Sequence, residues 1–220
     1  MEIKKKTTQM PQEFGVCIDW ETSGAIFGGD SSKDHQGISF GAVIFRTKTF
    51  EPVAKLYKLI KFDEQKYKWT ESAQKIHGLT KERLAAEGVT QEEAAMELLE
   101  LILKYFGPSS KVMILGHNPE FDNKFTNQLL ATIDFELTRE ILTLKERNAA
   151  LHPDRVYIEM HHVVLDTSAL GFITLGLSKS DLLFERIGFA DRGEHNALID
   201  AEMTLQTCAA MKQLVEAALG

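Results

Sequence analysis

The sequence has only two cysteines, Cys17 and Cys208, among its 220 residues. Two cysteines this far apart do not build the disulfide framework of a small secreted domain, and we expect both to be buried thiols in a reducing compartment. The sequence also lacks an uninterrupted apolar run near the ~20 residues that a membrane-spanning helix needs. These absences argue against a disulfide-stabilised or membrane-embedded protein and predict a cytoplasmic one without a membrane partner.

The N-terminal residues lack the apolar stretch of a signal peptide. Met1–Gln12 is polar and carries lysines, so we expect residues 1–12 to be a short solvated tail. The rest of the chain shows no linker, internal repeat or low-complexity segment. Residues 13–220 are therefore predicted to form a single domain, and they are numerous enough for a sizeable core.

An excess of basic charge is also missing, since 25 Lys and Arg face 32 Asp and Glu and the net charge is −7. Proteins that bind nucleic acid usually carry a basic excess, so this balance argues weakly against such a partner. A carboxylate cluster that holds divalent cations is an exception, because the metals neutralise the site and themselves attract phosphate.

Strand patterns come first in the chain, and strands then alternate with helical patterns. Consecutive strands joined by short turns imply an antiparallel meander of three strands, and the later alternation implies parallel strands covered by helices. We predict an α/β fold with a mixed sheet and helices on both faces. The predicted strands are 14–20, 38–47, 53–62, 111–116 and 162–166, and the predicted helices are 91–106, 118–130, 136–150, 177–187 and 196–211.

A pair of carboxylates ends the first predicted strand. Residues two positions apart in a strand point to the same face, so Asp19 and Glu21 project together. Adjacent carboxylates repel each other unless a cation lies between them, which favours a hard divalent metal. The alternative is an ordinary strand end that runs into a polar loop, and this short pattern does not decide between them. The next residue, Thr22, can offer its hydroxyl or its amide to a substrate.

A further acid follows a predicted junction between strand and helix, GHNPEFD at residues 116–122. Asn118 and Pro119 are typical of a helix start, which places Asp122 in the first turn, where the helix dipole favours an anion. Asp122 is therefore a candidate metal ligand. In the alternative interpretation, Asn118 only caps the helix and Asp122 only complements its dipole. We expect His117 to be packed or solvated rather than catalytic.

The third group consists of a histidine and the last candidate acid. His195 follows a polar loop that contains a glycine, and Asp200 lies five residues further on inside a predicted helix. A loop histidine can move, and its unperturbed pKa of about 6.5 suits a general base at neutral pH. For Asp200 the alternative is a surface aspartate, although the apolar neighbours Leu198 and Ile199 make that interpretation less attractive.

Together these three segments resemble the motifs of the DEDDh exonucleases, the DnaQ-like branch of the RNase H-like superfamily. Each motif alone is weak evidence, but three in the right order, each at the expected end of its element, are specific. The resemblance spans about residues 14–211. The matching positions, in the order of the motifs, are Asp19, Glu21, Asp122, His195 and Asp200.

The resemblance implies an RNase H-like sheet and a single exonuclease domain over residues 13–220. Such an enzyme removes nucleotides from the 3′ end of a nucleic acid with a free 3′-OH and releases nucleoside 5′-monophosphates. The four acids would hold two Mg²⁺ or Mn²⁺ ions around the scissile phosphate. One ion and His195 would generate the attacking hydroxide, while the other would stabilise the leaving oxygen. Protein partners stay unknown.

Two further stretches resemble the same family, IHGLT at residues 76–80 and LDT at residues 165–167. Aromatic side chains near the motifs can stack on bases, although Phe121 and Phe125 are also expected to pack in the core. We assign substrate binding to a set of neighbours of the motifs: Thr22, Trp20, His77, Asn118 and Phe121.

Two features near the motifs have an open interpretation. The segment 23–36 lengthens the chain directly after the first motif, and it is either a mobile lid beside the site or an ordinary solvated loop. A series of lysines is a candidate for contact with the phosphate backbone, and a solvated strand face is an equally good account of it. Its members are Lys55, Lys58, Lys61, Lys66 and Lys68.

Alternatives from other classes stay open at this point. The enzyme can act on RNA or on short or cyclic oligonucleotides, and DNA is only somewhat favoured, because no motif reports on contacts to the 2′-OH. A non-catalytic nucleic-acid-binding domain of the same fold is disfavoured, because each catalytic position carries the right chemistry. A purely structural α/β protein leaves that coincidence unexplained.

Overall fold

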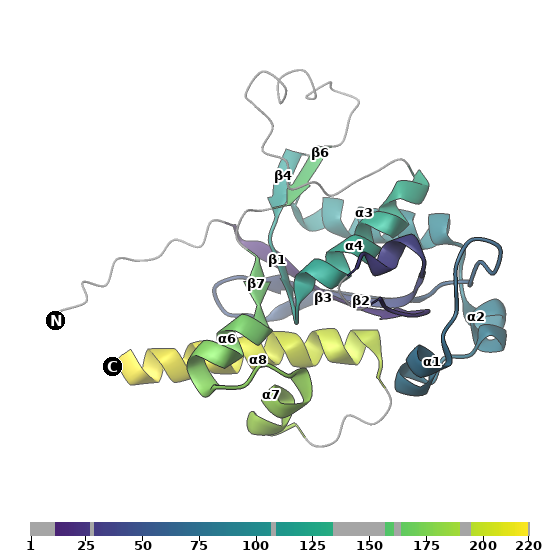
Figure 1. Cartoon of the computed structure of the whole chain (residues 1–220). Coiled ribbons are helices and arrows are strands. Elements are labelled where there is room, and N and C mark those ends of the chain that lie inside the picture. Colours follow the sequence, from purple (N-terminus) through teal and green to yellow (C-terminus); the bar gives the residue numbers. More distant parts are fainter. Residues whose placement is uncertain are drawn as a thin grey trace.

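The computed structural model describes residues 12–26, 29–106, 109–133, 157–160, 164–189 and 195–219. Its centre is a sheet with the strand order β3-β2-β1-β5-β7 (Figure 1). The first strands form an antiparallel meander, whereas β5 runs parallel to β1 and β7 parallel to β5. The predicted mixed sheet is therefore confirmed. Its strands are β1 (Phe14–Thr22), β2 (Gly37–Arg46), β3 (Pro52–Leu59), β5 (Ile114–Gly116) and β7 (Leu165–Asp166).

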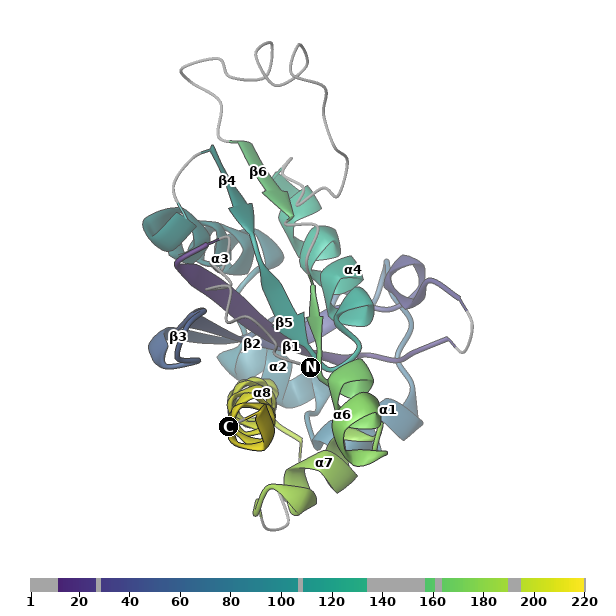
Figure 2. The same ribbon diagram turned by 90° about the vertical axis from the view of Figure 1, so that its left-hand side faces the viewer.

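Helices cover both faces of this sheet, as predicted. On one face lie α3 (Gln91–Phe106) and α4 (Pro119–Leu130), which pack on a core cluster that includes residues of β1 and β2. On the other face lies α8 (Ala197–Leu219), with α6 (Thr167–Leu175) and α7 (Ser180–Arg186) beside it. Figure 2 looks nearly along α8 and shows the sheet between these two layers.

The alternation of side chains along β1 divides them between the two layers. Val16 and Ile18 belong to the core under α3 and α4, whereas Cys17 belongs to the core under α8. The thiol of Cys17 donates a hydrogen bond to the carbonyl oxygen of Ala201 on α8, at 3.2 Å. Cys17 and Cys208 are both free and buried, as predicted. By the same alternation, Asp19 faces the α8 side of the sheet.

The observed elements differ from the predicted ones in several places. The strand predicted at 111–116 is divided at Met113 into β4 (Ser109–Val112) and β5, and β4 pairs with β6 (Tyr157–Met160) in a separate two-stranded sheet. Three helices were not predicted: α6, α1 (Glu71–His77) and α2 (Lys81–Glu87). The chain also has short 3-10 turns at Ser31–Lys33 and Ala131–Ile133. The helix predicted at 136–150 lies outside the described residues.

The described part of the segment 23–36 is fixed to the fold. Gln128 on α4 donates through Nε2 to the carbonyl oxygens of Ser32 and His35, at 2.5 and 2.6 Å, and accepts from the amide of Gly37 at 3.1 Å. His35 itself is buried. One side chain of α4 thus holds two backbone groups of this segment and the first amide of β2. These contacts argue against a mobile lid, and the role of the segment stays a prediction.

The predicted division into a tail and one domain stays a prediction, since residues 1–11 lie outside the described part of the chain. In the described part, no helix is both long enough and apolar enough to cross a bilayer.

Candidate active site

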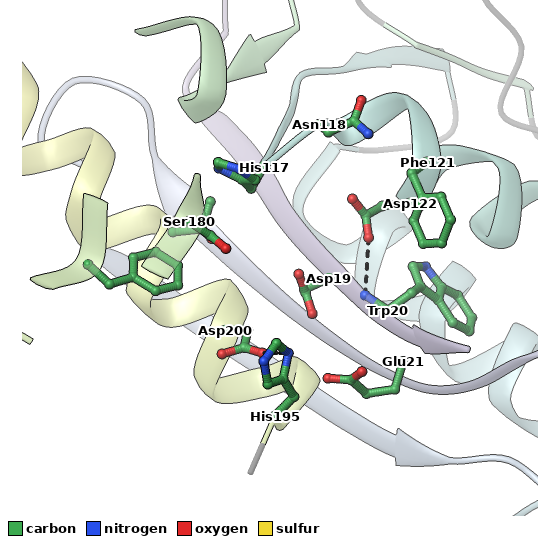
Figure 3. Close-up of a pocket in the computed structure, with 12 residues that line it drawn as sticks. Asp19, Trp20, Glu21, His117, Asn118, Phe121, Asp122, Ser180, His195 and Asp200 are labelled. Atoms are coloured by element: carbon green, nitrogen blue, oxygen red, sulfur yellow. Dashed lines mark hydrogen bonds and ion pairs between the residues drawn. The ribbon is translucent and has the colours of Figure 1, made fainter. Parts of the chain in front are cut away.

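The residues of all three sequence motifs line one pocket at the C-terminal end of β1 (Figure 3). They come from three elements that are far apart in the sequence: β1, the first turn of α4, and α8 with the residues before it. The structure thus brings together the five positions to which the sequence assigned catalysis. The complete lining is Asp19, Trp20, Glu21, His117, Asn118, Phe121, Asp122, Ser180, Phe184, His195, Asp200 and Thr204.

The sheet register fixes the first pair of acids. Asp19 lies opposite Gly41 and Glu21 lies opposite Ser39 in the antiparallel ladder of β1 and β2. Gly41 allows α8 to approach, because a Cβ at this position would lie 2.2 Å from the Cα of Leu198 and 2.3 Å from its nitrogen. No other residue fits in that space, so glycine in β2 sets how closely the start of α8 lies to the two carboxylates.

The start of α8 places the third motif. The side chain of Asn196 accepts hydrogen bonds from the amides of Leu198 and Ile199, at 3.1 and 3.3 Å, and so caps the helix. Asp200 then falls in the first turn, near the positive end of the helix dipole, and is buried. The imidazole Nδ1 of His195 lies 3.7 Å from Asp200 Oδ2. The loop residues 191–194 before this histidine lie outside the described residues.

Asp122 ties α4 to β1. Its Oδ1 accepts a hydrogen bond from the backbone amide of Trp20 at 3.1 Å, and the indole Nε1 of Trp20 donates to Thr126 on the same helix at 3.0 Å. Burial raises the pKa of the Asp122 carboxyl to about 8, although the Trp20 amide acts in the opposite direction. Asn118 occupies the N-cap position of α4, as predicted, but its side chain makes no capping hydrogen bond.

The donor groups in this pocket fit a hard divalent cation. Glu21, Asp122 and Asp200 are only 7%, 4% and 3% exposed, and burial of several carboxylates is costly unless a cation compensates their charge. One donor atom each from Glu21, His195 and Asp200 lies within 4.8 Å of the others, which is close enough for a shared ion. The pocket therefore has the geometry and the oxygen-rich chemistry of a metal site.

The residues assigned to substrate binding occupy two different environments. Asn118 and Phe121 line the pocket, and their assignment stays a prediction. Trp20 also lines it but is 5% exposed, and its ring packs 5.0 Å from that of Phe40, which leaves little surface for stacking on a base. Phe125 is fully buried, as expected for a core residue.

His77 and Thr22 do not belong to the pocket lining. His77 ends α1 and is 3% exposed, and its Nδ1 accepts a hydrogen bond from the amide of Leu79 at 3.0 Å. Burial lowers the pKa of His77 to about 4, so the ring is neutral at physiological pH. Thr22 is also buried and donates its hydroxyl proton to the carbonyl oxygen of Gly24 at 3.0 Å.

Most of the lysine series is occupied by ion pairs. Lys55 pairs with Glu202, Lys58 with Glu97 and Lys68 with Asp34. Lysines that already neutralise a carboxylate have less charge to offer to a phosphate backbone. This favours the interpretation of the series as a solvated, ion-paired surface over that of a nucleic-acid track.

Four lining residues were not found from the sequence: His117, Ser180, Phe184 and Thr204. Ser180 and Phe184 belong to α7 and Thr204 to α8, where helical spacing predicts only which residues are buried. His117 lies within the second motif, and its Nδ1 is 3.0 Å from the hydroxyl oxygen of Thr167. The sequence alone does not show that the LDT segment lies next to this histidine, and so His117 was not predicted to line the pocket.

Residues 16–208 match the family model of the RNase T exonucleases, which covers all three motifs. The chain belongs to the RNase T exonuclease family. The predicted resemblance and the predicted class of enzyme, an exonuclease, are both confirmed. A comparison with curated proteins finds no match.

Solved structures of exonucleases share the fold of this family member. E. coli exonuclease I in complex with a dA16 oligonucleotide superposes with a TM-score of 0.66 at 17% identity, over 92% of this chain and 41% of that chain. A product-bound exonuclease I gives 0.63 at 17% identity, over 94% and 44%. A 3′-exonuclease that recognises a histone mRNA stem-loop gives 0.62 at 15%, over 93% and 84%. The chain thus spans about two fifths of the exonuclease I chains.

Proposed function

We propose that this exonuclease removes nucleotides from the 3′ end of a nucleic acid with the help of two Mg²⁺ or Mn²⁺ ions and releases nucleoside 5′-monophosphates. One observation carries the proposal. Asp19, Glu21, Asp122, His195 and Asp200, from three separate elements, line a single pocket in an exonuclease fold. A phosphodiester is an anion and cannot approach these carboxylates unless cations intervene.

The chemistry of each side chain indicates whether it binds the ions or transfers a proton. The carboxylates of Asp19, Glu21, Asp122 and Asp200 would hold the ions, which when bound polarise the phosphate and lower the pKa of a bound water. His195 is the proton carrier. Because its Nδ1 is turned towards Asp200, its Nε2 is the nitrogen that accepts the proton of the attacking water.

For the substrate, we favour DNA somewhat over RNA. Exonuclease I, one of the similar folds, is seen with single-stranded DNA, whereas another similar fold is a 3′-exonuclease that recognises the 3′ end of an mRNA stem-loop. RNA and short or cyclic oligonucleotides are therefore the alternative substrates. Contacts to the 2′-OH, the group that distinguishes RNA from DNA, decide between the two nucleic acids.

The test uses oligonucleotides labelled at the 5′ end, of DNA and of RNA, single- and double-stranded. We expect products that shorten one nucleotide at a time in Mg²⁺ or Mn²⁺ and no cleavage in excess EDTA. A 3′-phosphate should block cleavage, because a site for a free 3′-OH has no room for the added charge. Full activity in chelator, dominant internal cuts, or equal rates on 3′-phosphorylated strands would each contradict the proposal.

A further inference from the structure

We propose that Asp166 and Thr167 are positioning residues that hold His117 and Asn118 against the substrate strand. This inference rests on the proposed function. Asp166 ends β7 and Thr167 begins α6, so neither residue comes from the elements that carry the carboxylates. Their side chains contact the two residues that join β5 to α4, and those two residues line the pocket.

The backbone of Asn118 receives such a support. Its φ of 60° and ψ of 56° lie in the left-handed region, which Asn tolerates better than most residues with a side chain but which still benefits from a fixed hydrogen-bond partner. Oδ1 of Asp166 accepts a hydrogen bond from the Asn118 amide at 3.0 Å. The same oxygen accepts from the amide and the hydroxyl of Ser168, at 2.9 and 2.8 Å, which fixes the carboxylate in place.

Thr167 fixes the ring of His117 in a comparable way. The Thr167 side chain is fully buried, and its hydroxyl oxygen lies 3.3 Å from the carbonyl oxygen of Gly116, a group that can only accept. A hydroxyl has one proton, so when Thr167 donates to Gly116 the proton of the 3.0 Å contact with His117 comes from the ring Nδ1. The threonine therefore sets both the tautomer and the orientation of the ring, with Nε2 on the edge away from Thr167.

The two supported side chains lie at the end of the pocket opposite the proposed base. Figure 3 shows His117 and Asn118 at one end and His195 at the other, with Asp19 between them. In an in-line displacement the leaving oxygen departs on the side opposite to the attacking water. The nucleotide that becomes the new 3′ end therefore lies towards His117 and Asn118, which offer it hydrogen-bonding groups rather than further negative charge.

The first experiment compares matched variants at Thr167 and Asp166. Thr167→Val keeps the buried volume but removes the hydroxyl, and we expect KM for a labelled DNA oligonucleotide to rise about tenfold, the effect of roughly one lost hydrogen bond. We expect kcat to stay within about threefold and Mn²⁺ affinity to be unchanged. Thr167→Ser should restore the wild-type KM. Asp166→Asn, whose amide oxygen can still accept, should be milder than Asp166→Ala.

Ser168→Ala is the control for Asp166, because it removes one donor to the same carboxylate and leaves the Asn118 contact intact. It should raise KM much less than Asp166→Ala does, because the Ser168 amide still donates to the carboxylate. Circular dichroism at the assay temperature must show that every variant is folded. A Thr167→Val protein with wild-type KM, or with weakened Mn²⁺ binding, would overturn the inference.

A double-mutant cycle then tests whether Thr167 acts through His117. If it does, Thr167→Val should lower kcat/KM about tenfold in the wild-type background and by less than about twofold in the His117→Ala background. An equal change in kcat/KM in both backgrounds would show that Thr167 does not act through His117 and would contradict the inference. An inactive wild-type enzyme would instead contradict the proposed function, so the two failures are distinguishable.

Discussion

Asp19 and His195 line the same pocket, yet their chemistry predicts that their replacement affects metal binding and turnover differently. Mg²⁺ prefers oxygen ligands, and the contact of His195 with Asp200 suits a proton carrier. Asp19→Ala should weaken metal binding and nearly abolish turnover. His195→Ala should leave metal binding almost intact and lower turnover by about 10²–10⁴-fold, the usual effect of losing a general base.

Calorimetric titration of Mn²⁺ into both variants, with rates from pH 5 to 9, separates these roles. The wild-type rate should rise through a group that titrates near neutrality, and this limb should disappear in His195→Ala. One donor atom of His195 does lie within 4.8 Å of donors from Glu21 and Asp200, so a ligand role is geometrically open. Equal loss of metal in both variants would assign His195 to the ligands.

Burial of His77 predicts a dependence of stability on pH. Its folded-state pKa of about 4 lies below the usual value of 6.5, so between these values the unfolded chain binds a proton that the folded protein excludes. The stabilising contribution is complete above pH 6.5 and is lost as the pH falls towards 4. From pH 7 to pH 5 this group should lower the unfolding temperature by at least about 2–4 °C, the effect of roughly 1 kcal/mol in a domain of this size.

His77→Asn is the matched variant for this prediction, since its amide oxygen can accept the Leu79 amide in place of Nδ1 but does not titrate. The fall in unfolding temperature from pH 7 to pH 5 should be smaller in this variant than in the wild type. An identical fall in both proteins would show that His77 is not the source.

At the scale of elements, the contact between β2 and α8 decides where Asp200 lies. Gly41→Ala would place a Cβ within 2.2–2.4 Å of backbone atoms of Leu198 and Ala197, and backbone cannot move aside without shifting the helix. We expect the variant to retain its helix content and to lose activity by at least about 10²-fold, as misplacement of a ligand by an ångström does.

Gly15→Ala serves as the control for Gly41→Ala. The three atoms nearest to its Cβ all belong to the ring of Phe45, a side chain of β2 that does not line the pocket. This variant should lose stability and keep its turnover below the unfolding temperature. Full activity of Gly41→Ala would show that α8 has freedom to adjust.

The long periodic elements could be predicted from the sequence, and the short ones could not. The meander, α3 and α4 follow from apolar periodicity and from helix-start residues, which are local signals. The helices α1 and α2 have only seven residues each, which is too short to show a clear apolar period. The main sequence signal for each is its N-cap residue, Thr70 or Thr80. The helix α6 has mostly apolar residues on all sides, so it shows no helical period.

The site shows the same division between local and long-range information. The carboxylates were predicted because residue type and position near the end of an element are local properties. The roles of Asp166 and Thr167 were not, because they depend on a contact across 48 or more residues with Asn118 and His117. Likewise, the burial of Trp20 and His77 follows from packing against α4 and Trp69, which no local pattern reports.

For the whole molecule, the carboxylates predict that metal binding stabilises the fold. The acids join the layers on both sides of the sheet, because Asp122 belongs to α4 and Asp200 to α8. A cation that binds only the folded state stabilises it by about 2.7 kcal/mol at a concentration of one hundred times Kd. Mn²⁺ should therefore raise the unfolding temperature by several degrees, at about 2–4 °C per kcal/mol.

Scanning calorimetry with and without Mn²⁺ measures this shift, and NaCl at equal ionic strength controls for general screening of the net charge of −7. The shift should vanish in Asp19→Ala. A shift of equal size with NaCl, or in the variant, would mean that the cation acts on surface charge and not in the pocket.

The hydrogen bond from Cys17 to Ala201 joins residues that are 184 positions apart, and this distance has a consequence during translation. A ribosome that adds about 5–20 residues per second makes α8 on the order of ten to forty seconds after β1. Throughout that interval the nascent chain has Asp19 and Glu21 but neither His195 nor Asp200. The polypeptide therefore lacks two of its catalytic residues until late in its synthesis, and the apolar face around Val43 and Phe45 is uncovered until α8 arrives.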